Sequence, residues 1–331
     1  MPDALFSYHG CVPPDGFAWI AARPTAEPVG KEPQPFLVAA RPEEGASGER
    51  AYELSDLDVV AYRSFAETQL DQESLLAFAN KFGALGLAVP ITFNPENARD
   101  HEAELQGESL QEWQRQISVM AELVALWDLY RAGDREGLAR HFRRGDETQR
   151  DVVTFFSHAD AEGETGRSTL GHLDTRERVL FDEALLEVHR RTEPGDELFP
   201  ALVSLKQRLD EQLQKCEKRA APFLTWASRD RLALRFSVCT LASALWLQFA
   251  DAVANNRSYT RCEVCKRWFE LAPDTARSHK RFCSDACRVA AYRDRQDRAR
   301  RLYFDQKKTF EQIAKELGSR VVTVRRWITG R

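Results

Sequence analysis

The stretch 262–287 reads CEVCKRWFELAPDTARSHKRFCSDAC and contains four of the chain's seven cysteines. Two residues separate Cys262 from Cys265, and three residues separate Cys283 from Cys287. A two-residue spacer lets one backbone turn direct both sulfur atoms to one point, and Zn²⁺ prefers about four such soft ligands in a tetrahedron. The spacing therefore predicts a structural zinc site in which the protein fills all four positions.

The residues around these cysteines predict a small finger of the treble-clef or zinc-ribbon kind. Trp268–Leu271 and residues 281–282 have the composition of short strands, with a turn between them at residues 273–274. Ser284 can cap a following helix. Because the module is small, we expect zinc to supply its folding free energy, and loss of any cysteine to unfold the tail and abolish its binding. Two alternatives stay open: an iron–sulfur cluster, and His279 as a ligand in place of one cysteine.

The C-terminal stretch 309–328 reads TFEQIAKELGSRVVTVRRWI and has the spacing of a helix-turn-helix. Thr309 and Gln312 form a capping box for a first helix, and Gly318 supplies a left-handed turn. Val324 belongs to the inward face of the second helix. An ordinary pair of antiparallel helices is the alternative, but a basic outward face on the second helix favours entry into a DNA groove.

Charge is distributed unevenly along the chain. The whole sequence has 47 Lys and Arg and 51 Asp and Glu, a net charge of -4. Residues 257–331 alone contain 20 basic and 9 acidic residues, so the part before them is acidic. A basic tail on an acidic body predicts a polyanionic partner, which we expect to be double-stranded DNA. The residues predicted to contact DNA are Arg288, Arg293, Arg295, Arg298, Arg301, Arg320, Thr323, Arg325 and Arg326.

Apolar residues at intervals of three and four before the cysteines predict a mainly α protein with a helical-bundle body. Helices are expected over four stretches: 71–82, about 109–127, about 196–216, and 230–255. A single short strand is expected at 36–40. Four domains are predicted: a Pro-rich irregular segment at 1–53, a helical regulatory and dimerisation domain at 54–256, the finger with a basic helix at 257–300, and the helix-turn-helix at 301–331.

A polar stretch of the body contains two His-x-Asp pairs, His158 with Asp160 and His172 with Asp174. Such pairs can bind a metal or transfer protons. Their spacing matches no defined catalytic motif, so we favour a surface loop with helix caps and expect no catalytic residue.

The sequence excludes several classes of protein. No apolar run reaches the roughly 20 residues that a membrane span needs, and the longest candidate, 236–250, is predicted to be a core helix. The N-terminus lacks the basic and apolar regions of a secretory signal. The odd number of cysteines and their close pairing favour a reducing cytoplasm.

The stretch 261–295, RCEVCKRWF…KRFCSDACRVAAYRDR, resembles the zinc fingers of bacterial CGNR-type proteins. Those proteins are described as stress-induced transcription regulators with a helical N-terminal domain. In this chain Arg288, Val289 and Ala290 follow the last cysteine, where that family has Gly-Asn-Arg. The tail from Thr309 is similar to the helix-turn-helix of many bacterial regulators and recombinases. Both resemblances imply DNA binding.

The sequence therefore predicts a cytoplasmic, zinc-containing, DNA-binding transcription regulator. We expect a homodimer, because a single small reading head binds DNA weakly. A small-molecule or protein effector is expected to act on the helical body. Two alternatives stay open: a nucleic-acid-processing enzyme with its chemistry in the body, and a component of a defence or toxin system whose tail binds DNA or RNA.

Overall fold

The computed structural model divides the chain into two compact units, Met1–Asn255 and Asn256–Arg331. The residues that it describes are 6–26, 32–40, 50–53, 60–93, 103–144, 152–156, 169–174, 198–216, 220–228, 231–271 and 280–330.

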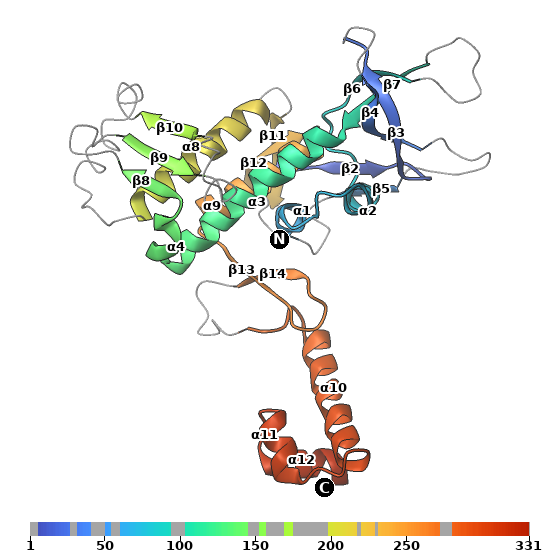
Figure 1. Ribbon diagram of the computed structural model, residues 1–331, viewed down its shortest axis with the longest axis vertical. Coiled ribbons are helices and arrows are strands. Elements are labelled where there is room, and N and C mark those ends of the chain that lie inside the picture. The colour runs from blue at the N-terminus through green and yellow to red at the C-terminus, as the bar shows by residue number, and fades with distance from the viewer. Residues whose placement is uncertain are drawn as a thin grey trace. The chain divides into compact units, whose positions relative to one another are not determined.

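The first unit contains a closed barrel of four antiparallel strands (Figure 1). Around the barrel the order is β3 (Phe17–Pro24), β4 (Gln34–Ala39), β7 (Ala103–Ser109) and β6 (Val89–Phe93). Phe36 and Val38 are two residues apart on β4, so both point into the barrel, where they pack with Ala22 and Ile91. A Cβ atom on Gly107 would lie 2.6 Å from Cδ1 of Ile91, so a larger residue at this position would have to displace that side chain.

The prediction of a mainly α helical bundle is wrong, because strands form the barrel and further sheets in the first unit. β8, β9 and β10 form one sheet, β11, β12 and β1 form another, and β2 pairs with β5. These strands span β1 (Phe6–Ser7), β2 (His9–Val12), β5 (Arg50–Glu53), β8 (Phe142–Arg144), β9 (Val152–Phe156), β10 (Thr169–Asp174), β11 (Ala220–Ser228) and β12 (Arg231–Val238).

The described part of residues 1–53, predicted to be irregular apart from one short strand at 36–40, has that strand as β4 and four further strands. It contributes β1 to β5. Pro24 is the last residue of β3 and Pro35 lies at the start of β4. Proline is tolerated at such strand ends, so a high proline content does not exclude a sheet.

The helix predicted over 230–255 is wrong in its first half. Arg231–Val238 is the strand β12, and α9 spans only Leu241–Ala254. Thr240 caps α9, because its side chain accepts a hydrogen bond from the Ser243 backbone N–H. The overlooked signal is an apolar residue at every second position, which is the period of a strand, at Leu232, Leu234, Phe236 and Val238.

The other predicted helices are present, although their bounds differ slightly. The described helices of the first unit are α1 (Ala61–Ala66), α2 (Gln72–Phe82), α3 (Leu110–Ala132), α4 (Arg135–Ala139), α8 (Leu198–Cys216) and α9. Ion pairs connect α3 to two of its neighbours. Arg63 of α1 donates two hydrogen bonds to Asp128, at 2.8 and 2.6 Å, and Arg208 of α8 donates to Glu122 at 2.6 Å. These contacts place α3 between α1 and α8.

Glu108, near the end of β7, connects the barrel with the helices. Its side chain is buried, and its carboxylate accepts hydrogen bonds from the backbone N–H groups of Leu85, Gly86 and Leu87 at 2.9, 2.6 and 2.7 Å. The indole N–H of Trp113 donates a fourth at 2.8 Å. Burial raises the pKa of Glu108, and the four donors oppose that rise. The carboxylate thereby holds the segment after α2 against the start of α3.

The described part of the second unit contains a short hairpin and three helices (Figure 1). Its elements are β13 (Ser258–Arg261), β14 (Trp268–Leu271), α10 (Asp285–Phe304), α11 (Phe310–Glu316) and α12 (Val321–Thr329). The three helices share one small core, made of Ala299, Leu302, Ile313, Ala314, Val324 and Trp327. Within the part of the chain that the structure describes, no helix is long and apolar enough to cross a bilayer.

Candidate metal centre and basic helices

The four cysteines predicted to bind zinc lie together in the second unit. The Sγ atoms of Cys262, Cys265, Cys283 and Cys287 all lie within 4.8 Å of one another. Sγ of Cys283 is 3.6 Å from the Sγ atoms of both Cys265 and Cys287. A tetrahedral site with Zn–S bonds of about 2.3 Å has sulfur–sulfur edges of about 3.8 Å. The four thiols therefore fit a metal site.

The first cysteine pair lies in the turn of the β13–β14 hairpin. The Cys262 N–H donates to the carbonyl of Arg267, and the Lys266 N–H donates to the carbonyl of Cys262, both at 2.9 Å. Lys266 has a φ of 59°, in the left-handed region, so the backbone reverses its direction there. This turn brings both sulfur atoms to the same side of the hairpin.

The predicted strand pairing of the finger is wrong. Trp268–Leu271 is a strand as expected, but it pairs with Ser258–Arg261 and not with residues 281–282. The reason is that the segment with the first cysteine pair is itself the tight turn of a hairpin. The turn predicted at residues 273–274, and the alternative ligand His279, lie outside the described residues.

The second cysteine pair is positioned by the start of α10. The Ser284 hydroxyl accepts a hydrogen bond from the Cys287 N–H at 3.3 Å, so Cys287 lies in the first turn and Cys283 directly precedes the cap. The Glu263 N–H donates to the carbonyl of Arg281 at 3.1 Å, and the two side chains form a bidentate ion pair. These contacts join the two cysteine segments.

The pKa values of two of the four thiols shift in opposite directions. Burial raises the pKa of Cys262, but backbone groups of Cys283, Cys265 and Val264 outweigh this effect and lower the pKa to about 6. Burial and the neighbouring thiols raise the pKa of Cys283 to about 12. Without a cation, such crowding keeps a thiol protonated, whereas a divalent metal displaces the protons. The donor set therefore suits a metal ion.

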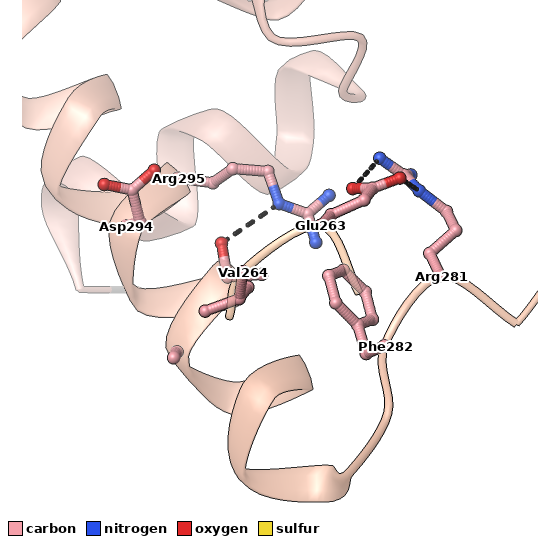
Figure 2. Close-up of a pocket in the computed structure, with 8 residues that line it drawn as sticks. Glu263, Val264, Arg281, Phe282, Asp294 and Arg295 are labelled. Carbon is pink, nitrogen blue, oxygen red and sulfur yellow. Dashed lines mark hydrogen bonds and ion pairs between the residues drawn. The ribbon is translucent and has the colours of Figure 1, made fainter. Parts of the chain in front are cut away.

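A pocket of about 560 Å³ lies between the two cysteine segments and α10 (Figure 2). In Figure 2 the Arg295 side chain extends along this pocket toward Glu263. Its Nε donates to the Ala291 carbonyl at 3.3 Å. Arg281, and to a smaller extent Arg295, lower the pKa of Glu263. Arg295, predicted to contact DNA, is therefore directed toward the finger. The pocket is lined by Glu263, Val264, Arg281, Phe282, Ala290, Ala291, Asp294 and Arg295.

Two other arginines of α10 that were predicted to contact DNA form ion pairs within the unit. Arg288 lies 3.2 Å from Asp285 in the preceding turn of the helix. Arg298 donates to Glu316 of α11 at 3.2 Å, and Lys308 donates to the same carboxylate at 2.6 Å. The pair of Arg298 with Glu316 thus connects α10 to α11.

Arg293 and Arg301 lie elsewhere on α10. At 3.6 residues per turn, they occupy a stripe roughly opposite the buried Ala299 and Leu302. Both are exposed, and within the described part of the chain neither forms an ion pair or a side-chain hydrogen bond. They therefore face away from the core that α11 and α12 share with α10.

α12 has one buried face and one basic face. Val324 and Trp327 are buried, and the Trp327 indole donates to the Tyr292 hydroxyl at 2.8 Å. The predicted contact Thr323 is half-buried beside this face. The exposed side chains include those of Arg320, Val322, Arg325 and Arg326. Arg325 also lies over the ring of Phe310, 5.5 Å from its centroid. Arg325 and Arg326 thus lie on the exposed side of α12, and Arg320 is exposed at its N-cap.

The His-x-Asp pairs of the body are only partly described. His158 and Asp160 lie outside the described residues. His172 and Asp174 lie on the strand β10, which pairs with β9 in an antiparallel arrangement. Catalytic chemistry at these residues stays an untested hypothesis.

Comparison of the chain with protein families, with curated protein sequences and with solved structures found no match. The resemblance to CGNR-type fingers and to bacterial helix-turn-helix proteins therefore stays a prediction from the sequence. The geometry defines a four-cysteine site compatible with metal binding, within a basic unit.

Proposed function

We propose that the protein is a zinc-containing transcription regulator whose unit Asn256–Arg331 binds duplex DNA. The observation that carries the proposal is the exposed pair Arg325 and Arg326 on the outward face of α12, with Arg320 exposed at the N-cap of the same helix. The opposite face of α12 is anchored in a core with α10 and α11, so these arginines are presented on a rigid support. The surplus of basic over acidic residues in this unit suits a polyanion.

Zinc is the metal that we propose for the four-cysteine site. Four thiolates fill a tetrahedral shell and leave no open position for a substrate water, so the role of the metal is structural. Zn²⁺ with four thiolates has a formal charge of −2, which nearby cationic side chains offset. Those close in sequence are Lys266, Arg267, Lys280, Arg281 and Arg288. The metal would fasten the hairpin to the first turn of α10.

We assign the reading of DNA to α11 and α12, acting as a helix-turn-helix. Thr309 and Gln312 form a capping box on α11, and Gly318, with a φ of 57°, allows the turn between the helices. α12 would enter the major groove with its exposed face toward the bases. Arg325 and Arg326 would there reach guanine edges or phosphates.

The acidic unit Met1–Asn255 is the part to which we assign dimerisation and the response to an effector. Two basic tails repel each other, whereas a dimer formed through the bodies would place two reading heads on one duplex. The effector would be a small molecule or a protein. Light scattering on the full-length protein is expected to give twice the chain mass of 37.8 kDa, and a monomer at all concentrations would contradict this assignment.

The salt dependence of duplex binding tests the proposed function. The full-length protein is titrated against a labelled mixed-sequence DNA duplex at ~50 and ~200 mM salt. If three phosphates are contacted, the affinity should fall about 40-fold between these concentrations. Absence of binding at ~50 mM salt would contradict the proposal. Stronger binding to an RNA of the same sequence would replace it with the RNA-binding alternative.

Substitution of Arg326 tests the assigned surface. Arg326→Ala should weaken duplex binding by about 5- to 150-fold, the loss expected for an arginine that contacts a base. The matched control is Arg140→Ala, which removes the same charge from an exposed position of the first unit. Equal affinities for the wild type and Arg326→Ala would remove Arg326 from the interface.

A further inference from the structure

Val322 is an apolar side chain on the basic face of α12. Among the described residues it is the most exposed large hydrophobic side chain, with 79% of its surface accessible. At 100° per residue it points away from the buried Val324 and Trp327. Arg326 follows one turn later on the same face, and Arg325 lies beside it. Val322 is therefore near the centre of the outward face.

Neither packing nor helix formation explains a valine at this position. Its side chain is mostly exposed and makes little packing contact within the unit. Valine is also a weaker helix former than alanine, lysine or glutamate, because its branched Cβ restricts the side-chain rotamers. An exposed apolar group between arginines instead suits a partner that is anionic overall and has a local apolar group.

The major groove of DNA contains one such group. The edges of guanine, cytosine and adenine present hydrogen-bond donors and acceptors there, whereas thymine adds a C5-methyl group. A valine pressed against the polar edges would leave donors or acceptors unpaired, which costs binding energy. Against the thymine methyl it buries apolar surface from both partners.

We infer that Val322 reads a thymine through its C5-methyl group, between the contacts made by the neighbouring arginines. The inference rests on the proposed DNA binding and adds a specificity determinant to it. The apolar side chain selects the base, while Arg325 and Arg326 supply charge and polar contacts on either side.

Replacement of single thymine methyl groups tests this contact. The full-length protein is used to select binders from a random-sequence duplex pool. Each thymine of a selected duplex is then replaced, one at a time, by deoxyuridine, which removes only the C5-methyl group. At one position we expect this change to weaken wild-type binding about fourfold, the effect of one buried methyl-sized group. The same change should not alter binding by Val322→Ala.

The chain offers a matched control for this experiment. Val289→Ala shortens another exposed valine of the same unit, on α10, and should retain the full deoxyuridine effect. Val322→Thr, which keeps the shape but replaces one methyl group with a hydroxyl, should lose affinity for the thymine duplex. The helical circular dichroism of Val322→Ala should equal that of the wild type, because the side chain is exposed.

Two results overturn the inference, and they are distinguishable. If every deoxyuridine substitution affects the wild type and Val322→Ala equally, Val322 does not read thymine, although salt-dependent duplex binding would still support the proposed function. If the protein binds no duplex even at ~50 mM salt, the proposed function fails and the inference fails with it.

Discussion

At the scale of single residues, the buried carboxylate of Glu108 accepts three hydrogen bonds from the backbone of another segment. In Glu108→Gln, the amide N–H group would face backbone N–H donors that now bond to the carboxylate. We expect the free energy of unfolding to fall by about 3 kcal/mol, measured by urea denaturation. The control Glu136→Gln, at a side chain that is 88% exposed, should change it by less than about 0.5 kcal/mol. Equal effects of the two substitutions would contradict this role of Glu108.

The four cysteines and Glu108 differ in how far the sequence predicts their roles. The cysteines are recognisable because each pair is close in sequence, so one local turn determines how both sulfur atoms point. Glu108 is not recognisable, because its backbone partners Leu85, Gly86 and Leu87 belong to another segment. Only the folded barrel brings that segment to the carboxylate.

Glu316 shows how one carboxylate affects the contact between two helices. Lys308 first, and then Arg298, lower the pKa of Glu316 below its ordinary value of 4.5. A group whose pKa is lower in the folded state contributes stability above its unfolded pKa and loses it as the pH falls through the folded value. Glu316→Gln should therefore lower the thermal midpoint of the second unit at pH 7.

The same comparison at low pH checks the sign of this effect. Below the folded pKa of Glu316, the carboxyl group is protonated in both the folded and the unfolded state. The wild type and Glu316→Gln should then melt at the same temperature. A difference between them that is equal at neutral and acidic pH would show that charge at Glu316 is not the cause.

At the scale of elements, the helical core of the second unit is separate from its cysteine site. The residues of that core lie on the C-terminal part of α10 and on α11 and α12. We therefore expect metal removal by a chelator, or Cys287→Ser, to speed amide exchange in β13, β14 and the first turn of α10. Exchange at Ile313, Ala314 and Val324 should remain slower. This outcome differs from the sequence-based expectation that the whole tail unfolds.

Hydrogen exchange measured by mass spectrometry distinguishes these outcomes. Cys239→Ser is the matched control, because Cys239 is an exposed cysteine of the first unit. It should leave exchange in the second unit unchanged. Uniformly fast exchange throughout residues 280–330 after metal removal would show that the three helices need the metal as well.

The strands of the first unit show the limit of periodicity at this scale. β12 has apolar residues that also fit a helical spacing, so it was predicted to be the beginning of a helix. Its pairing with β11 along nearly its whole length determines its conformation. Tertiary pairing thus overrides an ambiguous local pattern.

At the scale of the whole molecule, the two units differ in charge and in construction. The first unit is acidic and contains a closed barrel with helices, whereas the second is basic and, where the structure describes it, contains a hairpin and three helices. The charge difference could be read from composition alone. The barrel could not, because its closure pairs β3 with β6 and β4 with β7 across long separations in sequence.

Local signals in the sequence were sufficient for the cysteine site, the capping box at Thr309 and the start of α2 after Asp71, because each depends on neighbours within a few residues. The barrel, the parallel pairing of β1 with β12 and the exposed positions of the arginines depended on the packed structure. Such features arise from contacts between distant segments. Core packing against α10 directs Arg326 outward at α12, whereas Arg298 is directed to an ion pair.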